Sequence, residues 1–421
     1  MASSANRGVI HLQRLEGASS RGPATRNAEL RSPAVEEAVG ELCDAAGSAA
    51  DFGGAEVVVK PNVFMPHAPA TTDPRVVAGA ISWLLGAGAR RVIVAEESSI
   101  STYIGRGSST RQALEHASYG EMVAAFDTPR VRLAELRDEG TDRIPVQGGL
   151  VLREVDYPRL LAQADRVVNV PILKFHLQTL ITCAVKNTWS AADPLQRMMN
   201  HCWTLAGALL DVHHLRPPDL TLVDALQPLT RDHSYGDPLD FRLLMAGTDS
   251  IALDALGAYL LGWDDALAIE TVRLGAGAGL GEGRVGELTL EGLALTELPR
   301  ASAPEAPEVP AEFPPLEIEW QCGRRVGPGC VAYMTAGLRS LAMQTPVPSG
   351  RWQVFIGEGP ELPDKLGDRV LFIGACSLQG DTFRQVQRRL YLDRRADDLT
   401  VIPGCPPMAL RTEMMRMVGL D

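Results

Sequence analysis

Strand-length apolar runs alternate with longer helical patterns along most of this 421-residue chain. The run at residues 57–59 is followed by a helical pattern at 75–88 and a second apolar run at 92–95. This order is typical of a βαβ unit, in which the two strands lie parallel in one sheet. We therefore expect an α/β fold with a parallel sheet.

The same alternation continues and divides the chain into segments. We expect further strands at 166–170, 220–223 and 243–246, and helices at 177–189, 195–215 and 250–261. These elements predict a large, doubly wound, Rossmann-like domain over residues 36–297, preceded by a flexible arm at 1–35. A linker rich in Pro, Ala and Glu at 298–315 leads to a smaller α/β domain at 316–421. Its expected strands and helices are 354–356, 370–373, 400–402, 382–395 and 408–418.

Charge and hydropathy exclude several classes of protein. The net charge of -12 argues against broad nucleic-acid binding, which needs a basic face. Uninterrupted apolar stretches stay short of the roughly 18 residues that a membrane span requires. The first residues lack an apolar export segment, so we expect a cytoplasmic protein whose seven cysteines are reduced thiols.

Lysine is rare, and its positions are informative. Of 40 basic residues only four are lysine, and the other 36 are arginine. Lys60 ends the run Val-Val-Val-Lys-Pro-Asn, and Lys174 and Lys186 follow the strand expected at 166–170. Ligands of open parallel sheets bind beyond the carboxyl ends of strands. These three lysines are therefore predicted to share one site, while Lys365 lies in an ordinary polar loop.

The segment after Lys174 is almost free of charge and suggests a buried helix. A buried lysine either pairs with a carboxylate or meets an anionic ligand, because an unpaired buried ammonium is expensive. The structural alternative is an ion pair with a buried acid: Asp224, Asp249 or Asp254. The neighbouring hydrogen-bonding groups favour a binding site; these are Asn62, His176, Thr179 and Asn187. Glu96 and Glu97 either join the same edge of the sheet or form a solvated acidic turn.

An ordered set of short motifs resembles the domain-of-unknown-function 362 family over residues 56–262. The motifs are Lys60-Pro61-Asn62, Thr71-Thr72-Asp73-Pro74, Asn169-Val170-Pro171, Lys174-x-His176-x-x-Thr179, Ala184-x-Lys186-Asn187, Val223-Asp224, and Thr248-Asp249 with Asp254. The resemblance implies an α/β domain that is often associated with iron–sulfur modules.

Four cysteines gather in the last hundred residues, which contain no histidine: Cys322, Cys330, Cys376 and Cys405. Cys376 and Cys405 each come just after an expected strand, so parallel strands would bring both to one edge. Four thiolates hold either a [4Fe-4S] cluster or a structural zinc ion. The segment Gly404-Cys405-Pro406-Pro407 resembles the cluster-binding segment of hydrogenase small subunits. The structural alternative is four incidental thiols.

These features predict an iron–sulfur-dependent oxidoreductase that reduces a small anionic organic substrate. The expected catalytic residues are Lys174, His176 and Lys186, and the expected substrate-binding residues are Lys60, Asn62, Thr179 and Asn187. The expected partners are the substrate and a redox donor such as ferredoxin or flavodoxin, with a homodimer as the oligomer to test. Two alternatives stay open: a non-catalytic iron–sulfur electron-transfer or assembly protein, and a cluster-free enzyme with a structural zinc.

Overall fold

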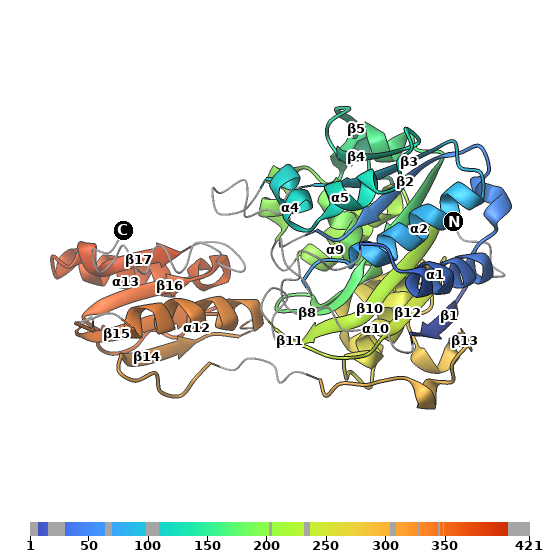
Figure 1. Ribbon diagram of the computed structural model, residues 1–421. Helices are drawn as coiled ribbons and strands as arrows, with labels where there is room; N and C mark the ends of the chain where they lie inside the picture. Colours follow the sequence, from blue (N-terminus) through green and yellow to red (C-terminus); the bar gives the residue numbers. More distant parts are fainter. Residues whose placement is uncertain are drawn as a thin grey trace. The chain divides into compact units, whose positions relative to one another are not determined.

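The computed structural model describes residues 7–15, 30–63, 70–97, 109–201, 204–230, 236–303, 309–324, 326, 328–343, 346–347 and 349–402. The chain divides into two compact units. The large unit comprises Met1–Asn200 with Thr204–Pro304, and the small unit comprises His201–Trp203 with Glu305–Asp421. Each unit has its own sheet, and Figure 1 labels many of the strands and helices of both.

An 11-stranded sheet forms the centre of the large unit, with a main path in the order β13-β1-β12-β10-β7-β2-β3-β4. Among these eight strands, β12 alone runs antiparallel to its neighbours, so the sheet is mostly parallel, as predicted. The bounds are β1 (Val9–Arg14), β2 (Glu56–Pro61), β3 (Arg91–Glu96), β4 (Val131–Glu135), β7 (Arg166–Val170), β10 (Leu220–Thr230), β12 (Leu243–Gly247) and β13 (Thr289–Glu291).

Helices cover both faces of this sheet (Figure 1). Val57 and Val59 of β2 point into one hydrophobic core and Val58 points into the other, because successive side chains of a strand alternate between faces. The first core is covered by α1 (Pro33–Ala46), α2 (Pro74–Gly86), α4 (Thr110–His116) and α5 (Tyr119–Ala124). The second is covered by α7 (Ala184–Asn187), α9 (Leu205–Leu215), α10 (Ser250–Leu260) and α11 (Glu270–Gly277).

The segment after β7 differs from the helix expected at 177–189. It forms a hairpin of β8 (Ile172–His176) and β9 (Leu180–Thr182), followed by the single turn of α7 and the 3-10 helix η3 (Thr188–Ala191). A short, uncharged apolar run fits a buried strand as well as a buried helix, and the pairing of β8 with β10 decides in favour of the strand. The helix expected at 195–215 is likewise two helices, α8 (Pro194–Asn200) and α9.

The start of the chain also differs from the flexible arm expected at 1–35. Residues Val9–Arg14 form β1, which lies between β12 and β13 inside the sheet. Its partners lie more than 200 positions further along the chain. Local sequence patterns do not reveal a pairing between segments so far apart in the chain.

Shorter elements complete the large unit. A separate two-stranded sheet is formed by β5 (Thr141–Pro145) and β6 (Glu154–Pro158), and β11 (Asp237–Pro238) pairs with β10. The remaining helical segments are η2 (Ala49–Phe52), α6 (Arg159–Ala162), η4 (Ala266–Ala268), η5 (Val285–Glu287) and η6 (Leu295–Glu297).

The small unit is a four-stranded parallel sheet with helices packed on it, which confirms a second α/β fold. Its strand order is β14-β15-β16-β17. The bounds are β14 (Glu317–Cys322), α12 (Pro328–Ala342), β15 (Arg351–Ile356), β16 (Arg369–Ile373), η7 (Ala375–Leu378), α13 (Thr382–Leu392), η8 (Ala396–Asp398) and β17 (Leu399–Ile402). The helix expected at 408–418 lies outside the described residues. Of the helices in the described part of the chain, none is long and apolar enough to span a bilayer.

Candidate functional site

The strand order reverses next to β2. The chain moves from β2 to β3 and β4 on one side, and later returns to β7 on the other side of β2. At the carboxyl ends of this pair Lys60 lies opposite Asn169, and Pro61 lies opposite Val170. Ligands of open α/β sheets bind in the crevice beyond such a switch point. The candidate site is therefore this crevice, where the sequence places Lys60 and Asn62.

Lys60 forms a buried ion pair with Glu96, the last residue of β3. Its Nζ lies 2.9 and 3.0 Å from the two carboxylate oxygens, and both side chains are at most 5% exposed. Burial lowers the pKa of the Lys60 ammonium, and the attraction of Glu96 opposes that shift. The partner of Lys60 is thus Glu96.

Glu96 also orders the surrounding backbone. Its carboxylate accepts hydrogen bonds from the Ser190 hydroxyl at 2.6 Å and from the backbone amides of Val63 and Glu97. Glu96 is only 4% exposed, so it is not a solvated acidic turn. Of the two alternatives that the sequence left open for Glu96, the structure shows the one at the same edge of the sheet as Lys60.

A chain of three asparagine amides crosses the switch point. Asn62 Nδ2 donates to Asn187 Oδ1 at 3.0 Å, and Asn187 Nδ2 donates to Asn169 Oδ1 at 2.8 Å and to the Lys60 carbonyl at 3.1 Å. Asn169 Nδ2 donates to the Ala184 carbonyl at 3.0 Å. Because a backbone carbonyl can only accept, the side-chain atoms of Asn169 and Asn187 that face the two carbonyls must be the NH2 nitrogens, and this fixes the direction of every amide. We call this set the amide chain. Asn62 Oδ1 is left buried, with no hydrogen-bond partner among the described residues.

Lys186 precedes Asn187 on α7 and differs from the other lysines of the large unit. Its side chain is half-buried, and its Nζ makes no hydrogen bond or ion pair within the described residues. Burial lowers the pKa of this ammonium to about 8. An amine with this pKa is cationic at neutral pH but readily gives up its proton.

Lys174 and His176 lie on β8, which pairs with β9 and β10 in the large sheet. Lys174 Nζ donates to the Ala70 carbonyl at 2.6 Å. His176 Nδ1 accepts hydrogen bonds from the backbone amides of Gln178 and Thr179, at 3.1 and 3.2 Å. Because Nδ1 accepts, the neutral ring carries its proton on Nε2. Thr179 Oγ1 donates to the Ile181 carbonyl.

Hydrogen bonds and ion pairs between described residues therefore join most of the predicted site residues into two groups. The amide chain and the Lys60–Glu96 pair join Lys60, Asn62 and Asn187 at the switch point. The hairpin turn joins His176 and Thr179. Lys186 is adjacent to the first group through α7.

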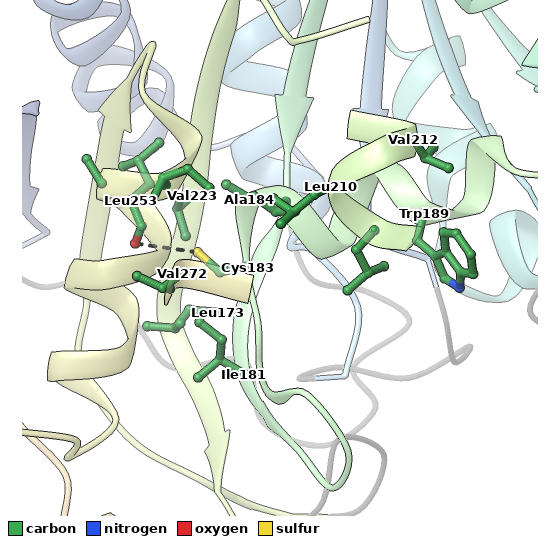
Figure 2. Close-up of a cluster of buried hydrophobic side chains, with 14 of the residues drawn as sticks. Leu173, Ile181, Cys183, Ala184, Trp189, Leu210, Val212, Val223, Leu253 and Val272 are labelled. Atoms are coloured by element: carbon green, nitrogen blue, oxygen red, sulfur yellow. Dashed lines mark hydrogen bonds between the residues drawn. The ribbon is translucent and has the colours of Figure 1, made fainter. Parts of the chain in front are cut away.

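The short helix α7 is held in place from both ends. Asp254, buried on α10, accepts a 2.6 Å hydrogen bond from the Ala184 amide, while Asn187 is held by the amide chain. Figure 2 shows Cys183 and Ala184 within the hydrophobic cluster that includes Leu173 and Leu253, with Cys183 Sγ directed at the Leu253 carbonyl. The backbone that carries Lys186 is therefore fixed by contacts that do not involve its amine.

Asp254 makes the stability of the large unit depend on pH. Burial raises the pKa of its carboxyl to about 7 in the folded protein, against about 4 in an unfolded chain. The folded state thus binds more protons between these values, so the free energy of unfolding falls as pH rises from about 4 to 7. Asp254→Asn keeps an oxygen acceptor but does not titrate.

Between pH 4 and pH 7 the free energy of unfolding should fall by about 2 to 4 kcal/mol more in wild type than in the Asp254→Asn variant. Urea denaturation at several pH values measures this difference. Equal pH dependence in both proteins would contradict it. Asp224, whose pKa burial also raises, to about 6, is present in both proteins and cancels in the comparison.

Cysteines mark the carboxyl edge of the small sheet. Cys322 ends β14, and Cys376 lies three residues after the end of β16. Cys330 is the third residue of α12, which leaves the same edge because it connects the parallel strands β14 and β15. Cys405 lies outside the described residues. Cys330 is 4% exposed and belongs to the core of the small unit, whereas Cys322 is exposed. Within the described residues, no three His, Cys, Asp or Glu side chains gather as a metal site.

Part of the large unit matches a known protein family. Residues 57–259 match the family described as "Domain of unknown function (DUF362)". This match confirms the resemblance inferred from the motifs over 56–262, and it contains both the switch point and α7.

The chain is also similar to individual proteins. It is 27% identical over 229 residues to a thylakoid-associated protein of Synechocystis sp.; the match covers 51% of this chain and 65% of that protein. The lactate racemase apoprotein from Thermoanaerobacterium thermosaccharolyticum matches with 13% identity and a TM-score of 0.34, covering 52% of this chain and 53% of its own. A protein from Thermotoga maritima matches with 10% identity and a TM-score of 0.31, covering 92% and 90%.

Proposed function

Proceeding from the family match of residues 57–259, we propose that this protein is a cytoplasmic iron–sulfur reductase of a small anionic organic substrate. The large unit binds the substrate in the crevice at the switch point. The observation that carries the proposal is Lys186, a half-buried cation whose charge is not balanced by a carboxylate in the described residues. Desolvating such a charge is expensive, so an anionic ligand is the natural partner.

The side chains at the crevice have separate roles in this proposal. The Lys186 ammonium binds the anionic group of the substrate, and the unpartnered Asn62 Oδ1 accepts a hydrogen bond from a substrate hydroxyl or amine. Lys60 is a positioning residue, because its ammonium is engaged by Glu96. Asn187 positions Asn62 through the amide chain.

The hairpin residues supply the other groups. The His176 Nε2–H donates a hydrogen bond to the substrate in this proposal, since its Nδ1 accepts from two backbone amides. Thr179 provides one of these amides and so orients the ring. Lys174 fixes the backbone at Ala70 through its hydrogen bond to the Ala70 carbonyl. In the described part of the chain, Ala70 is the next residue after Asn62 and Val63.

The cysteines support the redox part of the proposal. Cys322, Cys330 and Cys376 lie on elements that meet at one sheet edge, and Cys405 follows the neighbouring strand β17 by three positions. Thiols without histidine are the ligand type that a [4Fe-4S] cluster takes, and zinc takes the same type. A cluster bound there would supply single electrons, which a small donor such as ferredoxin or flavodoxin would replenish.

Metal analysis of the anaerobically purified protein tests the redox part. We expect about four iron and four sulfide per chain, together with a brown colour. Cys405→Ser should lose most of the iron, whereas Cys43→Ala, which changes a buried cysteine of the large unit, should retain it. A colourless protein with zinc and no sulfide, or with no metal, would show that the reductase proposal is wrong.

A further inference from the structure

We propose that Lys186 is a nucleophile that condenses with an aldehyde or ketone group of the bound anion to form an imine. This inference rests on the proposed function and narrows its substrate class to carbonyl-bearing anions. It assigns Lys186 a covalent step in addition to charge recognition.

The three lysines of the large unit differ in what their amines contact. Lys60 Nζ is held by both oxygens of Glu96, and Lys174 Nζ donates to the Ala70 carbonyl at 2.6 Å. Lys186 Nζ makes no hydrogen bond or ion pair with the described residues. An amine that attacks a carbonyl must have its lone pair available, and of these three only Lys186 meets that condition.

The surroundings of Lys186 combine a fixed backbone with an unengaged amine. Asp254 anchors the start of α7, and the hydrogen bonds of Asn187 to Asn169 and to the Lys60 carbonyl anchor its end. Fixed placement reduces the entropy that a covalent step must lose. An ordinary structural lysine shows the opposite arrangement, in which the amine itself is bonded.

Burial also raises the fraction of neutral amine. With a pKa of about 8, about a tenth of Lys186 is unprotonated at pH 7. An ordinary lysine with a pKa of about 10.4 has less than about a thousandth in that form. Lowering the pKa of a lysine by desolvation is an established route to a Schiff-base nucleophile.

The step balances without an oxidant or reductant. The ammonium first releases a proton to water, and the amine nitrogen then forms a bond to the carbonyl carbon. One N–H proton passes to the carbonyl oxygen, which restores a lone pair on the nitrogen. The oxygen takes up a second proton and leaves as water while this lone pair forms the C=N bond, and loss of the last N–H proton to water gives the neutral imine. Borohydride, added as a probe, transfers hydride to the imine carbon and converts the C=N bond into a stable secondary amine.

Reductive trapping tests the inference, and the four lysines of the chain make the readout simple. The full-length protein is treated with glyoxylate, a small anionic aldehyde, in the presence of borohydride, and peptide mapping locates the label. We expect Lys186 to be labelled at least about tenfold faster than the exposed Lys365 at pH 7, because about a tenth of Lys186 is neutral at that pH. Lys60 and Lys174 should stay unlabelled. Equal or slower labelling of Lys186 would overturn the inference.

Two controls separate this inference from the proposed function. Propanal, a neutral aldehyde of similar size, should label Lys186 more slowly than glyoxylate if the crevice attracts anions. Equal rates would leave the nucleophile established and the anion site refuted. Conversely, glyoxylate that binds wild type but not Lys186→Met, without leaving a label, would support the anion site and refute the imine.

Discussion

At pH 6 the free energy of unfolding of a Glu96→Gln variant is expected to be about 3 kcal/mol lower than that of wild type. The substitution leaves the Lys60 ammonium buried without its carboxylate, and removing one member of a buried pair costs about 3 to 5 kcal/mol. The Ser190 hydroxyl and the amides of Val63 and Glu97 also lose a charged acceptor. Denaturant unfolding of the two proteins measures the difference.

The cost of Glu96→Gln should shrink as the pH rises. Burial already lowers the pKa of Lys60, and the loss of Glu96 lowers it further, so the folded variant binds fewer protons than its unfolded chain. Its stability therefore rises with pH between the folded pKa and about 10.4. The double variant Lys60→Met with Glu96→Gln removes both charges and should recover much of the loss. A single variant within about 0.5 kcal/mol of wild type at pH 6 would show that the pair does not hold the strand ends together.

Lys186→Met is expected to abolish substrate binding and turnover while making the folded protein more stable. Met has a similar length and no charge, so the desolvation of the ammonium disappears at neutral pH. A lysine whose pKa is lowered in the folded state destabilises that state below the folded pKa, and the effect fades as the pH rises towards about 10.4. We expect a gain of about 1 kcal/mol or more at pH 7 and little difference at pH 10.

This combination of effects separates a functional lysine from a structural one. A structural residue loses stability and activity together when it is replaced, whereas a residue kept for function at the expense of stability loses only activity. Lys365→Met, on the exposed surface of the small unit, is the matched control and should change neither property. A Lys186→Met variant that is less stable than wild type and binds the ligand normally would contradict the assignment.

The positions of the strands at the site could be predicted from the sequence, but the order of these strands in the sheet could not. The strand at 166–170 coincides with β7, and the strand ends marked Lys60 and Asn62 at the switch point. The partner of Lys60 was not predicted, because Glu96 reaches it only through the position of β3 beside β2. Strand order is a property of the whole sheet and leaves little trace in a local pattern.

The hairpin shows a second limit of local patterns. The uncharged segment after Lys174 has the composition of a buried helix, yet β8 and β9 pair there because β10 extends beyond the sheet edge and offers a neighbour. The turn of helix that carries Lys186 consequently begins only after β9, at Ala184. The lysine count remained informative, since it pointed to Lys186 without any knowledge of the fold.

The most direct test of the account is the titration of Lys186 in the intact protein. With lysine labelled by ¹³C at Cε, the chain gives four side-chain NMR signals, and the one missing from Lys186→Arg belongs to Lys186. The account predicts that this signal titrates near pH 8 and shifts when glyoxylate is added. A midpoint near the ordinary value of about 10.4, with no response to the anion, would contradict it.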